Sequence, residues 1–163
     1  MTVKQLSVFL ENREGRLQQI FNILKEANVN VVSVSIAETS DYGIVRMIVS
    51  DVDGALAALK AHNITAKVVD VLAVNISHEV GSLSKFLNAI ADAGINIKYM
   101  YGLSTGDTGA SIAFKTDDLE GTEKALESLD VQYYTPESLE NVEETIVHER
   151  SAFAGRLLTF HDV

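Results

Sequence analysis

Two glycines stand where the backbone could bind an anionic ligand. Gly15 and Gly81 each follow a strand-like alternation of apolar residues and precede a helix-like one. A glycine at the start of a helix lets backbone N–H groups approach a ligand, and the positive helix end favours a carboxylate. The α-carboxylate of an amino acid suits such a site, although both glycines also suit ordinary tight turns. The candidate binding residues in the two loops are Asn12, Arg13, Glu14, Gly15, Arg16, Leu17, His78, Val80, Gly81, Ser82 and Leu83.

Two arginines in the first loop could pair with the carboxylate of a ligand. Arg13 and Arg16 stand on either side of the loop glycine. Glu11 and Glu14 lie beside them, so a solvated ion pair at the surface is the alternative interpretation.

Asn30, Asn96 and Tyr101 complete the set of candidate ligand-binding residues. Asn30 and Asn96 open strand-like segments, where an asparagine either contacts a ligand or forms a turn by bonding to its own backbone. Tyr99 and Tyr101 have serines at the matching places in the first half of the chain. If both halves bind ligand, they should therefore bind it differently.

The sequence favours neither catalysis nor metal binding. The segment 107–110, Asp-Thr-Gly-Ala, resembles the tetrapeptide of aspartic proteases. Asp41 and Gly43 hold the matching places in the first half, which indicates shared hairpin turns instead. The four histidines, of which His78 lies in the second loop, lack metal-ligand spacing, and the sequence has no cysteine. We therefore expect no enzyme activity, no metal ion and no cofactor.

The composition predicts a soluble globular protein. Of the 163 residues, 47% are hydrophobic, which is enough to bury a sizeable core. The sequence has 13 basic and 23 acidic residues and a net charge of −10, so its surface should repel nucleic acids. No apolar run reaches the length of a membrane helix and no signal peptide is recognisable, so we expect a cytoplasmic protein that does not bind membranes.

The chain contains two copies of one module. A constant offset aligns Gly15 with Gly81, and identical residues recur at this offset through both halves. The other identical pairs are Leu6 and Leu72, Val8 and Val74, Leu17 and Leu83, Asn22 and Asn88, Ala27 and Ala93, Asn30 and Asn96, Thr39 and Thr105, Asp41 and Asp107, and Gly43 and Gly109. After Gly43 the offset grows by one residue, which keeps matching apolar residues on the same side of a sheet.

Each copy predicts the order strand, helix, strand, strand, helix, strand. This order is the ferredoxin-like βαββαβ arrangement, an antiparallel four-stranded sheet with two helices on one face. We therefore predict an α+β fold with two such modules, residues 2–69 and 70–136, packed side by side because no linker separates them. For the acidic C-terminal extension, residues 137–163, a packed helix, a partner-binding segment and a loose end remain alternatives.

The loops and the segments that follow them resemble those of ACT domains. Residues 11–17, followed by a helix and then residues 28–31, show the pattern in the first copy, and residues 77–83 and 93–97 supply it in the second. With residues 35–44 included, the chain resembles the free-standing tandem ACT proteins of bacteria.

The resemblance covers about residues 2–136 and implies sensing rather than catalysis. ACT domains bind small regulatory ligands, most often free amino acids, at interfaces between paired modules. Many ACT loops carry proline before the glycine, where this chain has Glu14 and Val80, and this departure concerns loop rigidity and ligand choice.

The leading hypothesis is an amino-acid sensor that acts through ligand-dependent pairing of its modules or subunits. Each module is small, so we expect lateral packing and homodimerisation, and an enzyme that the protein regulates is a further expected partner. The alternative is a regulatory subunit of an amino-acid biosynthetic enzyme, because residues 6–17 are similar to the start of the acetolactate synthase small subunit.

Overall fold

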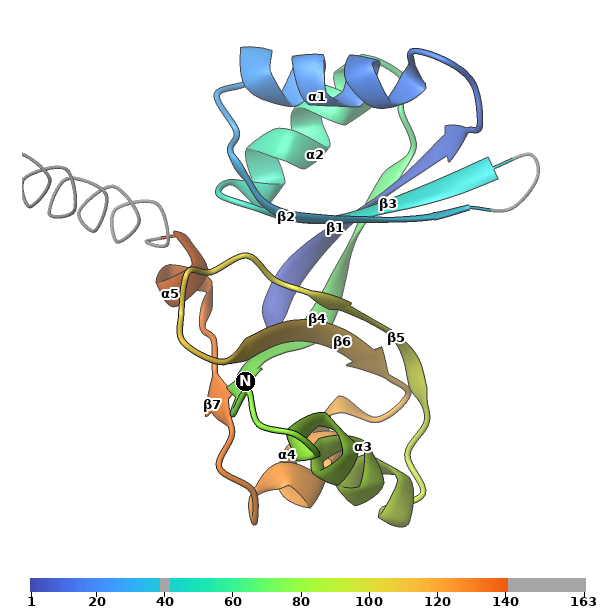
Figure 1. Ribbon diagram of the computed structural model, residues 1–163. Helices are drawn as coiled ribbons and strands as arrows, with labels where there is room; N and C mark the ends of the chain where they lie inside the picture. The colour runs from blue at the N-terminus through green and yellow to red at the C-terminus, as the bar shows by residue number, and fades with distance from the viewer. Residues whose placement is uncertain (39–41, 141–163) are drawn as a thin grey trace, which may run out of the picture.

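The computed structural model describes residues 1–38 and 42–140, which form a mixed α+β fold (Figure 1). In chain order the elements are β1 (Val3–Glu11), α1 (Arg16–Glu26), β2 (Val31–Glu38), β3 (Tyr42–Val49), α2 (Val52–Ala61), β4 (Ala66–Ile76), α3 (Ser82–Asp92), β5 (Ile97–Gly102), β6 (Ala110–Thr116), α4 (Leu119–Leu126), β7 (Gln132–Tyr133) and α5 (Pro136–Glu140). Of the predicted extension, α5 lies among the described residues and residues 141–163 lie outside them. No helix in the described part of the chain has the length and apolar character that spanning a bilayer requires.

The strands join one antiparallel sheet that contains the same arrangement twice. The sheet order is β2-β3-β1-β4-β6-β5, and β7 also pairs with β4. The first module therefore has the order β2-β3-β1-β4, and the second repeats it as β5-β6-β4-β7. The prediction of two ferredoxin-like modules is confirmed.

Strand β4 belongs to both modules. Its first half pairs with β1, from Ala66 opposite Val8 to Val71 opposite Val3. Its second half pairs with β6, starting with Leu72 opposite Phe114. Pairing with β1 thus ends at Val71, and pairing with β6 begins at the next residue, Leu72. The module boundary that the sequence predicts, between residues 69 and 70, therefore falls inside β4.

Each module packs two helices onto one face of its part of the sheet. In the first module, Leu6, Val8 and Leu10 of β1 point into a core that α1 and α2 cover, which explains the alternation of apolar residues there. The largest buried members of this core are Leu6, Ile20, Leu24, Met47 and Leu59. In the second module, Phe86 of α3 meets Phe114 of β6 edge to face, with ring centroids 5.2 Å apart.

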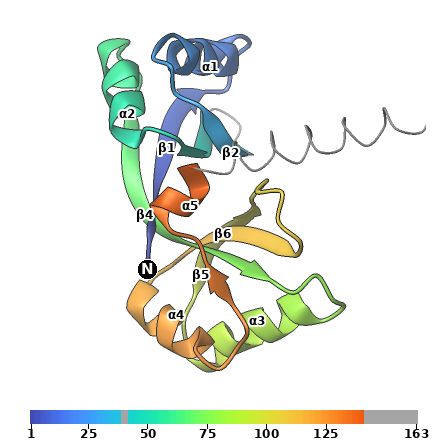
Figure 2. The ribbon, with the colours of Figure 1, turned by 90° about the vertical axis from the view of Figure 1, so that its left-hand side faces the viewer.

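The helix-free faces of the two half-sheets turn toward each other. Helices α1 and α2 lie outside one half and α3 and α4 outside the other, with the strands between them (Figures 1 and 2). A third buried apolar cluster joins the two faces and contains Val3, Ile48, Val71, Ala73, Tyr134 and Leu139. Because Leu139 belongs to α5, the start of the C-terminal extension packs over the junction of the modules.

A polar strip continues beside this cluster, and we call it the seam. Its residues are Gln5, Ser7, Ser33, Arg46, Tyr99 and Tyr101. Gln5 is fully buried; its Nε2 donates to Tyr99 Oη at 3.0 Å, and Tyr101 Oη donates to its Oε1 at 2.9 Å. Ser33 Oγ donates to the carbonyl of Gly102 at 3.1 Å. The serine-to-tyrosine differences between the copies therefore make the two faces complementary.

Burial of Tyr101 should make the fold sensitive to alkali. Burial raises the pKa of Tyr101 well above its ordinary value of 10.0, the neighbouring Tyr99 raises it further, and Arg46 opposes part of this. The unfolded chain loses the phenol proton near pH 10 while the folded chain keeps it, so stability falls as the pH rises above 10. The expected slope is up to about 1.4 kcal/mol per pH unit for this one proton.

Urea unfolding of the wild type and of Tyr101→Phe at several pH values above 10 tests this. The variant should lose stability less steeply with pH, because it lacks the phenol. Burial also raises the pKa of Tyr133, which contributes equally to both proteins. Equal slopes for the two proteins would contradict the prediction.

Candidate ligand-binding site

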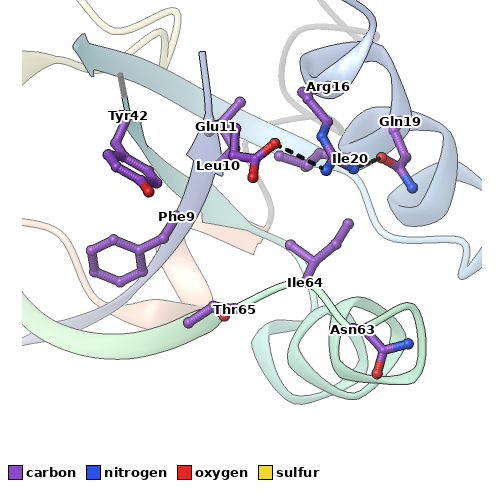
Figure 3. A pocket seen from close by; sticks show the side chains of 10 residues that line it. All are labelled: Phe9, Leu10, Glu11, Arg16, Gln19, Ile20, Tyr42, Asn63, Ile64 and Thr65. Carbon is purple, nitrogen blue, oxygen red and sulfur yellow. Dashed lines mark hydrogen bonds and ion pairs between the residues drawn. The ribbon is translucent and has the colours of Figure 1, made fainter. Parts of the chain in front are cut away.

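The first module holds a pocket where β1 ends and where α1 and β4 begin (Figure 3). It encloses about 310 Å³. Its lining residues are Phe9, Leu10, Glu11, Arg16, Gln19, Ile20, Tyr42, Asn63, Ile64 and Thr65. An apolar wall thus faces a small set of polar groups, which is the usual composition of a small-molecule site.

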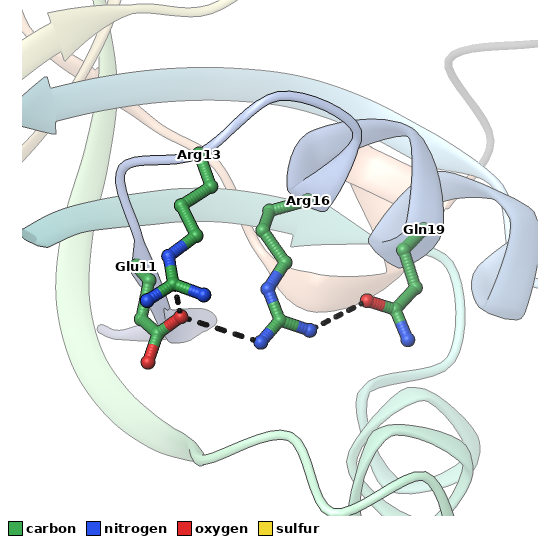
Figure 4. Close-up of polar contacts among 4 residues, drawn as sticks. All are labelled: Glu11, Arg13, Arg16 and Gln19. Carbon is green, nitrogen blue, oxygen red and sulfur yellow. Dashed lines mark hydrogen bonds and ion pairs between the residues drawn. The ribbon is translucent and has the colours of Figure 1, made fainter.

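The polar groups of the pocket form a connected chain (Figure 4). Arg16 Nη2 lies 3.5 Å from Glu11 Oε2, and Arg16 Nη1 donates to Gln19 Oε1 at 3.0 Å. Arg13 Nε approaches the same Glu11 oxygen at 3.2 Å from outside the pocket. The surface pairing expected for the arginines is present, and it brings one guanidinium and one carboxylate to the same pocket.

The start of α1 is open to an anion. Gly15 is the N-cap of α1 and has a left-handed φ of +80°. No side chain among the described residues accepts a hydrogen bond from the N–H groups at the start of this helix, and its first turn contains no acidic residue. Gly81 at the start of α3 has the same features with a φ of +91°. In contrast, Asp51 caps α2 and Asp118 caps α4, each accepting a backbone N–H at 2.9 Å. The first N–H of α1 and that of α3 each donate to a loop carbonyl, from Arg16 to Arg13 at 3.3 Å and from Ser82 to Glu79 at 3.1 Å. The N–H groups of the next two residues of each of these helices are therefore the ones available to a ligand carboxylate.

The remaining predicted residues of the first loop lie around the pocket rather than in it. Asn12, Arg13 and Glu14 are exposed, and Leu17 packs against the core of the module. Gly15 lines a separate shallow hollow over α1. Of the loop residues that we predicted, Arg16 is the one that lines the pocket.

The predicted asparagines lie away from the loops. Asn30 follows the opposite end of α1, where its backbone N–H donates to Ser50 Oγ at 2.9 Å. Asn96 takes the matching place in the second module, and its N–H donates to Asp117 Oδ1 at 3.3 Å. Within one copy of the chain, neither asparagine joins a glycine loop.

The second loop differs in character from the first. His78, Val80, Gly81 and Leu83 are exposed, and Ser82 is half-buried. Residues 77 and 82 are serines where the first loop has its carboxylate and guanidinium, so the charged pair has no counterpart there. Tyr101 lies in the seam, bonded to Gln5, rather than near this loop.

Several pocket residues escape sequence reasoning. Phe9 and Tyr42 come from neighbouring strands, and the segment 63–65 comes from the connection between α2 and β4. Asn63 has a left-handed φ of 56°, and an asparagine after a helix was the available signal for that turn. Across residues 1–38 and 42–140, no three acidic or histidine side chains gather as a metal site would require.

Comparison with known proteins places this geometry among related folds. A family model described as an ACT domain pair matches residues 1–143. The chain is similar to the solved structure of protein BT0572 from Bacteroides thetaiotaomicron, with 33% identity, a TM-score of 0.79 and coverage of 86% of this chain and 96% of that one. It is also similar in fold to the regulatory subunit of aspartate kinase from Thermus thermophilus, with 18% identity, a TM-score of 0.52 and coverage of 76% and 87%. No curated protein matches the chain.

Proposed function

Because the chain belongs to the ACT domain family, as a pair of ACT domains, we propose that it is a regulatory protein that binds a free amino acid. The ligand binds in the pocket of the first module, residues 2–69. The observation that carries this proposal is the pairing of Glu11 with Arg16 at 3.5 Å inside that pocket, next to an uncapped helix.

The pocket suits both charged groups of an amino acid. Arg16 and the N–H groups at the start of α1 bind the α-carboxylate, and Glu11 accepts from the α-ammonium group. Both side chains are more than two-fifths exposed, so a ligand reaches them without unfolding the loop. The apolar wall, which includes Phe9, Ile20 and Ile64, favours a ligand with an apolar side chain.

Binding is proposed to act through subunit pairing in the cytoplasm. Strand β2 is at one end of the sheet, so its outer edge is open to a further strand. Val34 and Ile36 on this strand are 44% and 54% exposed. A second copy of the chain would cover them, and the resulting homodimer would present a ligand-dependent surface to a regulated enzyme.

A regulatory subunit of an amino-acid biosynthetic enzyme is the second candidate. The similarity of residues 6–17 to the acetolactate synthase small subunit favours it, and the fold is shared with an aspartate kinase regulatory subunit. In this case the purified protein should form a stable complex with a catalytic subunit encoded nearby, and the complex should respond to the same amino acid.

A thermal-melt screen against the standard amino acids tests the sensor. A ligand at about 100 times its Kd should stabilise the protein by about 2.7 kcal/mol and raise its Tm by several degrees. Arg16→Met should weaken binding about 10- to 100-fold, because it removes a charge-assisted bond to the carboxylate.

Arg13→Met is the matched control. Arg13 contacts the same Glu11 oxygen but is 73% exposed and lies outside the pocket, so its replacement should leave binding nearly unchanged. A screen in which no amino acid shifts the Tm, or equal losses in the two variants, would argue against the proposed site.

A further inference from the structure

Arg46 carries a positive charge into the seam. Its guanidinium carbon lies 4.0 Å from the centre of the Tyr99 ring, so an aromatic face from the second module fixes the plane of a side chain from the first. No carboxylate in the described part of the chain lies within ion-pair distance of it. Its Nε atom is buried and has no hydrogen-bond acceptor among the described residues. A buried cationic N–H without an acceptor is costly, which indicates that this group is adapted to an additional acceptor.

The groups around Arg46 also have donors to spare. Gln5 Nε2 donates to Ser7 Oγ at 2.9 Å and to Tyr99 Oη at 3.0 Å. Both hydroxyl oxygens therefore act as acceptors, and their own protons have no acceptor in the described part of the chain. If the Gln5 amide is flipped, its oxygen accepts the hydroxyl protons of Ser7 and Tyr99, and its nitrogen donates to Tyr101 Oη. The hydroxyl proton of Tyr101 is then the one without an acceptor. In either orientation the seam holds more donors than acceptors.

The sheet register brings further hydroxyl groups beside the guanidinium. Ser7 of β1 and Ser35 of β2 lie directly opposite Arg46 on the two strands that flank β3. Tyr99 covers it from the second module. Arg46 and Ser35 are both half-buried, so the group is partly shielded from water without being sealed. Partial shielding strengthens a charge-assisted hydrogen bond relative to one in open solvent.

We propose that the seam is a second ligand site, which binds a small carboxylate through Arg46. A planar guanidinium of fixed orientation matches the two oxygens of a carboxylate, and the hydroxyl groups of Ser7, Ser35 and Tyr99 supply additional donors. The net charge of −10 repels anions from the protein as a whole, so binding here depends on this local arrangement. The site is separate from the pocket of the first module and takes residues from both modules. A carboxylate bound there links the two helix-free faces.

Side-chain NMR of the full-length chain tests the site. The Nε–H signals of the arginines are followed while acetate, succinate or inorganic phosphate replaces chloride at constant ionic strength. A carboxylate should shift the Arg46 signal saturably and leave the signal of Arg13, which is 73% exposed and lies outside both sites, nearly unchanged. If phosphate shifts the Arg46 signal and neither carboxylate does, the assignment to a carboxylate is wrong. If adding more chloride shifts the Arg46 signal as much as the carboxylates do, the effect is one of ionic strength and the proposed site is wrong.

Variants at the seam supply the quantitative test, with calorimetry as the readout. Arg46→Met should weaken carboxylate binding about 10- to 100-fold, and Arg46→Lys by about 10-fold, because lysine keeps the charge but loses the planar fork. Tyr99→Phe keeps the ring and should weaken binding several-fold. Arg13→Met, which lies outside both sites, should bind the carboxylate like the wild type. Arg46→Lys should keep the rise in Tm that an amino acid produces, so failure of the amino-acid pocket is distinguishable from failure of this site. Unchanged binding in Arg46→Lys, whose fold is checked by circular dichroism, would overturn the proposal.

Discussion

Truncation of Phe114 to alanine is expected to lower the free energy of unfolding by about 3–5 kcal/mol. The side chain is fully buried and meets Phe86 edge to face, so its removal leaves a cavity between β6 and α3. Phe114 also pairs directly with Leu72 of β4. Because β4 is common to both modules, we expect the whole chain to unfold in one weakened transition rather than the second module alone.

Met47→Ala is the matched variant in the first module. Met47 lies opposite Leu6, is fully buried and should cost about 2–5 kcal/mol when truncated. Urea unfolding followed by far-ultraviolet circular dichroism measures both variants. Two separate transitions, with each variant shifting a different one, would contradict a shared unfolding unit.

Replacement of Gly109 by alanine should destabilise the protein by about 2–5 kcal/mol. Gly109 has a φ of +124°, which costs a residue with a side chain about 1–2 kcal/mol. A Cβ there would also lie 2.6 Å from Asn75 Oδ1 and 2.8 Å from the carbonyl oxygen of Ile76, and such overpacking costs about 1–3 kcal/mol. Thermal and urea unfolding of the purified variant give the value directly.

Gly43→Ala is the control, because Gly43 occupies the equivalent place in the first module. A Cβ there would meet its nearest neighbour, Leu10 Cδ2, at an ordinary 3.7 Å, and its φ is not left-handed. We expect a change within about 1 kcal/mol for this variant. If both variants were equally destabilised, the tight approach of Gly109 to β4 would not be the cause.

The fold was predictable because its signals are local and repeated. The apolar alternation in β1 and the helical spacing in α1 recur at a fixed offset in β4 and α3, so each copy supports the interpretation of the other. The extra residue placed in the second hairpin keeps Met47 and Phe114 in the same role, opposite Leu6 and Leu72. Helix starts at Gly15 and Gly81 follow from the same pattern.

The seam and most of the pocket were not predictable, because they depend on contacts between distant segments. Ser7 alternates with apolar residues as in a strand with one wet face, yet it is buried because the second module covers that face. Tyr101 differs from its counterpart in the first copy, and sequence alone does not tell a ligand contact from a contact between modules. In the same way, Asn63 reaches the pocket only because β4 begins beside the end of β1.

Strand β4 also limits how the protein can be divided. A cut between residues 69 and 70 leaves the first fragment without the β4 residues that pair with Val3 and Lys4. It leaves the second with a β4 that still carries the pairing edge for β1. Each fragment then lacks part of the strand pairing of its sheet. We therefore expect the two fragments to associate and complement each other rather than to fold as independent domains. The sequence shows two repeated units, but in the folded protein the boundary between them is the middle of a single strand that belongs to both.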